Sequence, residues 1–177
     1  MVDFTTAQGR TLDDFVAGLS GSGHRGLWLY GPRKSGTTTF GWEASQRVYA
    51  ASAEGVGMLP GNRITAHELV DLQRRVWTQE ELMRSNAHDF SLWQETQALM
   101  DKWDAVWNAN VLLLDDLISP DIEFWKKHML IRIDARLKGP GVTIIAGVCG
   151  PDRFGPDWNV GFTRSCTVAK LGDRGEG

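Results

Sequence analysis

A glycine-rich segment between a strand pattern and a helix pattern limits this chain to few folds. The segment GPRKSGTT runs from Gly31 to Thr38 and follows the apolar run LWLY at residues 27–30. It matches the phosphate-binding loop pattern G-x-x-x-x-G-K-[ST] at both glycines and at Thr38, but Thr37 occupies the lysine position. Such a loop joins a strand to a helix, and residues 37–51 have a helix pattern. We therefore expect a mixed α/β fold around this segment.

Length and composition are those of one ordinary globular domain. The chain has 177 residues, 42% of them hydrophobic and 23% charged, which is enough to bury a proper core. No apolar run approaches the roughly 18 residues that indicate a membrane span, and no secretion signal is evident. The net charge of -3 argues against a strongly basic nucleic-acid-binding protein. We expect a cytoplasmic protein without membrane contact.

Strand and helix patterns alternate along the chain. Strand patterns lie at residues 27–30, 62–65, 111–117, 142–148 and 166–171, and helix patterns at residues 11–19, 37–51, 67–76, 91–107 and 122–137. This alternation predicts a three-layer α/β fold in which helices flank a parallel five-stranded sheet. A Leu and Trp stripe runs along residues 91–107, and we interpret it as core packing.

The segment VLLLDDL at residues 111–117 carries the second chemical signal. Its continuous apolar run is typical of a central parallel strand that is covered on both faces. Asp115 and Asp116 end the run, at the edge where open α/β sheets place their ligand chemistry. After a phosphate-binding loop, this is the Walker B position. We interpret Asp115 as a residue that holds Mg²⁺ directly or through a water, together with Thr38, and Asp116 as the group that orients the attacking water. The alternative is an acidic turn that ends a buried strand.

The order of these segments resembles the helicase-loader branch of the AAA+ ATPases, which includes replicative helicase loaders and the ATP-binding subunits of some transposition systems. The resemblance is carried by TLDDFV, GLWLYGP, RITAHELVDLQ, NVLLLDDL and RIDARLKGPGVTIIAG. It implies an AAA+ P-loop core over residues 26–177, preceded by an N-terminal helix and loop over residues 1–25. It also implies that the ligand is ATP or ADP with Mg²⁺. The implied partner is a replicative helicase or another AAA+ protein, with self-association as a further option and only indirect or weak contact with DNA.

The same resemblance assigns roles to individual residues. The nucleotide would lie on Gly31, Pro32, Arg33, Lys34, Ser35, Gly36, Thr37, Thr38 and Thr39. Catalytic roles would fall to Asp116, Arg136 and Arg164, of which the two arginines would reach the nucleotide of a neighbouring subunit. The alternative for both arginines is a solvated or ion-paired surface position. Backbone amides of residues 33–38 and the following helix N-terminus can hold a phosphate without the lysine.

Three departures from the family pattern bear on activity. Thr37 offers a hydroxyl without charge, and losing a charge-assisted contact of about 1.5 to 3 kcal/mol lowers affinity roughly tenfold to more than a hundredfold. The sensor position at residues 146–149 reads AGVC, with no polar side chain except the Cys149 thiol. The sequence ends soon after Leu171, so we expect the C-terminal lid of many AAA+ proteins to be absent.

These departures favour weak or absent ATP hydrolysis and a role exerted through protein partners. The alternative is an active ATP-binding and ATP-hydrolysing helicase loader in which Lys34 or Arg33 replaces the missing lysine. A P-loop nucleotide kinase ranks third, because phosphoryl transfer depends on the same missing charge.

Overall fold

A five-stranded parallel sheet forms the centre of the protein. The computed structural model describes residues 6–19, 24–53, 62–86, 89–118 and 122–172. The strands are β1 (Gly26–Tyr30), β2 (Asn62–Thr65), β3 (Val111–Leu117), β4 (Val142–Gly147) and β5 (Cys166–Lys170). They lie in the order β2-β3-β4-β1-β5, and every neighbouring pair is parallel. The predicted α/β fold and its five-stranded parallel sheet are confirmed.

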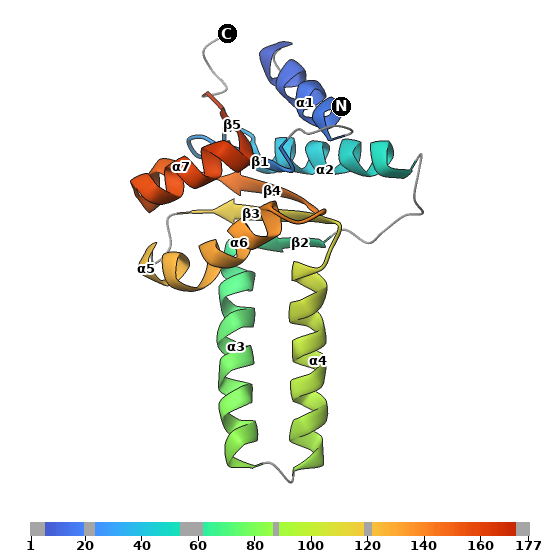
Figure 1. Ribbon diagram of the computed structural model, residues 1–177, viewed down its shortest axis with the longest axis vertical. Coiled ribbons are helices and arrows are strands. Elements are labelled where there is room, and N and C mark those ends of the chain that lie inside the picture. Colours follow the sequence, from blue (N-terminus) through green and yellow to red (C-terminus); the bar gives the residue numbers. More distant parts are fainter. Residues whose placement is uncertain (1–5, 20–23, 54–61, 87–88, 119–121, 173–177) are drawn as a thin grey trace.

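Helices cover both faces of this sheet (Figure 1). They are α1 (Thr6–Gly18), α2 (Thr37–Ala53), α3 (Ala66–Ser85), α4 (Phe90–Trp107), α5 (Ile122–Phe124), the π-helical turn η1 (Trp125–Met129), α6 (Leu130–Leu137), the 3₁₀ turn η2 (Pro151–Phe154) and α7 (Pro156–Ser165). Helices α1 and α2 pack on one face, while α3, α6 and α7 pack on the other. The three layers expected from the alternating sequence are present. Among the described residues, no helix is long and apolar enough to cross a membrane.

The packing of β3 explains why its sequence is apolar without interruption over its first four residues. Leu112 and Leu114 belong to the core on the α3 side, whereas Val111 and Leu113 belong to the core on the α2 side. Successive side chains of a strand point to opposite faces, and here both faces are covered. A central strand therefore needs apolar residues at every position, which is the pattern that the sequence carries.

Helices α3 and α4 form a hairpin that projects from the sheet (Figure 1). Near the sheet the hairpin is buried: Trp103 of α4 is 3% exposed. Near its far end, Phe90 is 70% exposed and Trp93 is 50% exposed. The apolar stripe expected to pack in the core therefore does so only in its sheet-proximal half.

Two elements differ from the sequence expectation. Helix α3 continues to Ser85 rather than ending near Val76, because its partner helix α4 supports the extension. The segment Pro151–Ser165, for which no helix was expected, forms η2 and α7. Its prolines stand at helix starts, where the missing amide costs nothing, and Phe162 anchors α7 in the core at 1% exposure.

Candidate phosphate-binding site

The loop between β1 and α2 has the backbone shape of a phosphate cradle. Lys34 and Gly36 have positive φ angles of 72° and 92°. Left-handed residues alternating along a turn direct successive amides into one concave surface, which suits an anion. Glycine adopts this conformation without strain, whereas Lys34 adopts it against its steric preference. The sequence motif is therefore realised as a loop at the carboxyl edge of β1, where it was predicted.

The start of α2 leaves amide donors available next to this loop. The Phe40 amide donates to the Gly36 carbonyl at 2.8 Å, closing the first helical turn. Within the described part of the chain, the amides of Thr37, Thr38 and Thr39 donate to no backbone acceptor. A helix N-terminus also carries a partial positive charge. Backbone donors at a helix N-terminus are groups that hold phosphate in known anion sites.

The side chains of the loop divide into an exposed and a buried set. Pro32, Arg33 and Lys34 are exposed, and neither cation forms an ion pair with a described residue. Ser35 is 5% exposed, and its hydroxyl finds no hydrogen-bond partner among the described residues. A side chain at Gly31 would meet that hydroxyl at 2.8 Å and the Leu171 carbonyl at 2.5 Å, so glycine is required there.

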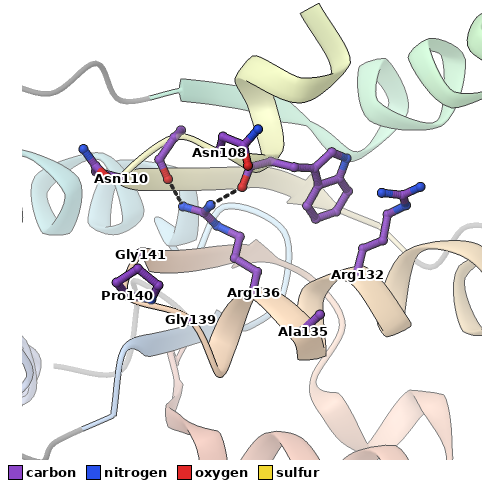
Figure 2. Close-up of a pocket in the computed structure, with 10 residues that line it drawn as sticks. Asn108, Asn110, Arg132, Ala135, Arg136, Gly139, Pro140 and Gly141 are labelled. Atoms are coloured by element: carbon purple, nitrogen blue, oxygen red, sulfur yellow. Dashed lines mark hydrogen bonds between the residues drawn. The ribbon is translucent and has the colours of Figure 1, made fainter. Parts of the chain in front are cut away.

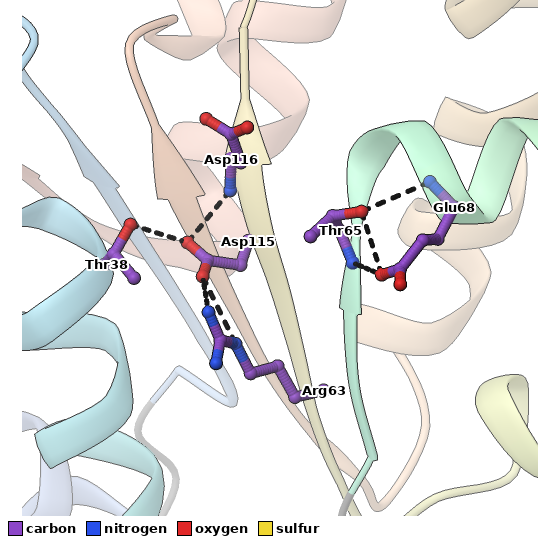
Figure 3. A network of polar contacts seen from close by, with 6 residues as sticks. All are labelled: Thr38, Arg63, Thr65, Glu68, Asp115 and Asp116. Atoms are coloured by element: carbon purple, nitrogen blue, oxygen red, sulfur yellow. Dashed lines mark hydrogen bonds and ion pairs between the residues drawn. The ribbon is translucent and has the colours of Figure 1, made fainter.

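Asp115 contacts the start of the helix that follows the loop. Asp115 is buried, and its Oδ1 accepts a hydrogen bond from Thr38 Oγ1 at 3.0 Å (Figure 3). The same oxygen accepts the Asp116 amide at 2.8 Å. The structure therefore brings together Thr38 and Asp115, the two residues predicted to form a metal site.

An arginine that the sequence reading did not single out completes this cluster. Arg63 of β2 donates from Nη2 and Nε to Asp115 Oδ2, at 2.7 and 3.2 Å (Figure 3). Arg63 of β2 pairs in register with Leu113 of β3, so the two side chains point to the same face of the sheet. Asp115 lies two positions after Leu113, and side chains two positions apart on a strand also share a face. Arg63 and Asp115 therefore share the α2 face. Only the register between β2 and β3 reveals this, so no local sequence signal could have found it.

These contacts decide whether Mg²⁺ fits as predicted. The oxygens of Thr38 and Asp115 are ligands that Mg²⁺ prefers. An ionised carboxylate offers about four acceptor positions, and here four N–H or O–H groups already donate to Asp115. Two of these four groups belong to the cationic guanidinium of Arg63, so the positive charge that a metal would supply is present. In this arrangement Asp115 does not fit a directly bound Mg²⁺ ion.

Asp116 does not join the cluster through its side chain. Its φ angle is 55°, and the pairing between β3 and β4 shifts register between Leu114 and Leu117. This bulge turns the Asp116 carboxylate away from that of Asp115 (Figure 3). It lines a pocket with Arg74 of α3 and Phe124 of α5. The expected water-orienting residue therefore lies on the α3 side of the sheet, away from Thr38.

Arg136 has a different role from the one predicted. It lies at the amino edge of the sheet, where its guanidinium donates to the carbonyls of Trp107 and Ala109 (Figure 2). It also donates to the Val142 carbonyl. Its Nε donates to Thr143 Oγ1 at 3.0 Å, and burial lowers its pKa. Its donors bind its own chain, so it is not available to a neighbouring subunit's nucleotide. We correct its assignment to a structural arginine.

The remaining predicted positions are simple to place. Arg164 is exposed in the last turn of α7 and forms no ion pair within the described residues, so its role stays a prediction. Cys149 at the sensor position is 4% exposed, and its carbonyl accepts the Trp28 indole N–H at 2.9 Å. It packs in the core and adds no polar side chain to the site.

Comparisons with known proteins agree with this geometry at the level of the fold. No family model matches the sequence, and no curated protein matches it significantly. The crystal structure of the DnaC helicase loader superposes with a TM-score of 0.61 at 16% identity, covering 97% of this chain and 93% of that one. AMPPCP-bound DnaA from Aquifex aeolicus gives a TM-score of 0.57 at 14% identity, covering 97% of this chain and 48% of that one.

A further structure, of DnaA bound to AMPPCP and single-stranded DNA, gives a TM-score of 0.57 at 12% identity, with 97% of this chain and 47% of that one covered. The chain thus spans about half the length of the DnaA structures that it matches. Identities this low show the fold alone. The protein shares the α/β fold of the solved DnaC and DnaA structures.

Proposed function

We propose that this protein is an AAA+-like nucleotide-binding protein that acts in DNA replication through protein partners and hydrolyses ATP weakly or not at all. The observation that carries the proposal is the loop at residues 31–39. Among the described residues, the amides at its helical end donate to no backbone acceptor, yet Thr37 stands at the position of the cationic side chain. Binding through the backbone survives such a change, whereas stabilisation of charge developing on a transferred phosphoryl group does not.

Two further observations support weak hydrolysis. The Asp116 carboxylate turns away from the Thr38 and Asp115 pair, so the residue predicted to orient water does not face that pair. The sensor position offers only a buried thiol. Hydrolysis needs a positioned water together with charge stabilisation, and both are weakened here.

The proposed partner is a replicative helicase or another AAA+ protein. The solved DnaC is a helicase loader, and one DnaA structure holds single-stranded DNA. On this chain, Phe90 and Trp93 stack at 6.2 Å near the exposed end of the α3–α4 hairpin. Exposed aromatic side chains are enriched at protein interfaces, which supports action through a protein.

The second candidate function is an active ATP-hydrolysing loader. It is favoured by the intact contact between Thr38 and Asp115 and by the exposure of Arg33 and Lys34. Either cation can swing toward a bound triphosphate, because no described residue holds it in an ion pair.

Calorimetric titration with ATP tests the proposal on wild type, Thr37→Lys and Lys34→Ala, with Lys102→Ala on exposed α4 as the charge-matched control. We expect weak wild-type binding that Thr37→Lys tightens about tenfold or more, because a charge-assisted contact is restored. Lys34→Ala and Lys102→Ala should behave alike. Selective loss of binding in Lys34→Ala would favour the active loader.

Phosphate release measured alongside separates binding from turnover. We expect wild-type release near background. Turnover of about one per second, within the normal range of enzymes, would contradict the proposal. Absence of ATP binding in both wild type and Thr37→Lys would show that the cradle does not bind nucleotide.

A further inference from the structure

The guanidinium of Arg63 pairs with Asp115, the aspartate that the sequence predicted as a metal ligand. We infer that Arg63 replaces Mg²⁺ as the cation paired with Asp115, so that nucleotide phosphate binds here without a divalent metal. The inference rests on the proposed function, because it concerns the same phosphate site. It adds a property that neither the loop sequence nor the fold indicates.

The burial of Asp115 makes a cationic partner necessary. Its side chain is 2% exposed, and a buried carboxylate without a compensating partner is strongly destabilising. In the described residues the only ion pair to Asp115 comes from Arg63. Thr38 and the Asp116 amide stabilise the other oxygen without supplying charge. Arg63 is thus the sole source of neutralising charge among these contacts.

The same contacts exclude a metal from the carboxylate. Two donors reach each oxygen of Asp115, which uses the acceptor positions that a metal would need. A divalent ion at either oxygen would also lie close to the guanidinium and be repelled by it. Metal binding would therefore require Arg63 to leave, and its departure would cost two charge-assisted hydrogen bonds.

Arg63 also retains capacity for a ligand. Its Nη1 group donates to no described residue, and its side chain is 50% exposed. A guanidinium offers five N–H donors, and phosphate oxygens are among its preferred acceptors. Thr38 links the Asp115 carboxylate to the first turn of α2, which places Arg63 across that carboxylate from the amides proposed to hold phosphate. Arg63 can thus neutralise Asp115 and contribute positive charge toward the phosphate.

The first test measures ADP affinity by calorimetry in excess Mg²⁺ and, separately, in EDTA. Wild type should show the same affinity in both buffers, within about twofold. Arg63→Gln leaves Asp115 without a cation, so we expect about tenfold weaker binding in EDTA than in Mg²⁺, the size of one lost charge-assisted contact. Arg84→Gln removes an equal charge from the exposed end of α3 and should behave as wild type.

The second test needs no nucleotide. Mn²⁺ binding to the free protein is followed by electron paramagnetic resonance, with Mn²⁺ as the probe for a divalent ion. Wild type and Arg84→Gln should bind none at the site, whereas Arg63→Gln should bind Mn²⁺, and Arg63→Gln combined with Asp115→Asn should not. Equal Mn²⁺ binding by wild type and Arg63→Gln would overturn the inference.

A folding control keeps the tests decisive, because Arg63→Gln leaves a buried carboxylate poorly paired. Arg63→Lys keeps the positive charge with a different donor geometry. It should therefore retain metal-independent ADP binding, and circular dichroism checks that each variant is folded. If wild-type ADP binding requires Mg²⁺, the inference fails and the proposed function stands. If no variant binds ADP in either buffer, the proposed function fails and the inference fails with it.

Discussion

Arginines join neighbouring strands at both edges of the sheet, but they differ in what their donors contact. At the amino edge, Arg136 donates to three backbone carbonyls and a threonine hydroxyl of its own chain. At the carboxyl edge, Arg63 donates to one carboxylate and remains half exposed. Arg136 satisfies acceptors within the protein, whereas Arg63 keeps donors that are exposed.

The backbone groups near the two arginines differ in the same way, because those near Arg136 are hydrogen-bonded and some of those near Arg63 are not. Near Arg136, the strand starts are held by hydrogen bonds such as Val142 N to Asn110 O at 2.7 Å. Near Arg63, the amides at the start of α2 have no described backbone acceptor. Unsatisfied donors at an exposed helix start cost little, because water reaches them, and they are ready for an anion. The amino edge is thus closed by contacts within the chain, whereas the carboxyl edge keeps donors that the proposed phosphate site would use.

The largest expected effect is on stability, from Arg136→Met. This change removes the donors for three backbone carbonyls, and we expect a loss of about 3 kcal/mol or more in the free energy of unfolding. The matched control is Arg132→Met, one turn earlier, whose guanidinium lies 5.0 Å from the centre of the Trp103 ring. That exposed contact is worth about 0.5 to 1 kcal/mol. Urea unfolding measures both, and equal losses would contradict the structural role of Arg136.

A smaller loss of stability is expected from Gly147→Ala at the carboxyl edge. The added methyl group would lie 2.4 Å from the Leu117 carbonyl oxygen and 2.6 Å from its amide nitrogen, in the bulge that sets the direction of Asp116. We expect a loss of about 2 kcal/mol, the usual cost of overpacking.

The control for that change is Gly161→Ala in α7, where an added methyl group meets nothing within 4 Å. This variant should be neutral or more stable by about 0.5 to 1 kcal/mol, because alanine favours a helix over glycine. Thermal unfolding of both variants checks the pair. A neutral Gly147→Ala would show that the bulge adapts, and that its geometry does not hold Asp116 in place.

The smallest effect concerns the pH dependence of the α3 cap. The amide and hydroxyl of Thr65 donate to the Glu68 carboxylate at 2.9 and 2.8 Å, and these bonds lower the pKa of Glu68 below its ordinary value of 4.5. A lowered pKa in the folded state means that the stabilisation is present above pH 4.5 and disappears as the pH falls through the lowered pKa.

We therefore expect Glu68→Gln to be less stable than wild type near neutral pH by a few tenths of a kcal/mol, because the group is exposed. The difference should vanish in acid. Melting curves recorded across this pH range measure it, with Glu95→Gln on exposed α4 as the control without a cap. A difference between wild type and Glu68→Gln that grows in acid would contradict the capping role.

Much of the architecture could be predicted because it depends on local patterns. The apolar run at residues 111–117 indicated a strand buried on both faces, and the glycine spacing at residues 31–36 indicated the loop. The pairing of Thr38 with Asp115 followed from the order of the two motifs, since both end at the carboxyl edge of a parallel sheet. Helix α7 was missed because Pro151, Gly155 and Pro156 resemble loop signals, although they mark helix starts.

The sequence alone determined the α/β class, the glycine-rich loop between a strand and a helix, and the threonine at the lysine position of its pattern, because each depends on residue types at short spacing. The tertiary structure decided what the side chains of three polar residues contact. Strand register brought Arg63 to Asp115, a bulge turned Asp116 toward α3, and burial at the amino edge engaged Arg136 with carbonyls. Side-chain partners across a sheet depend on register and direction, and neither is encoded within a single segment.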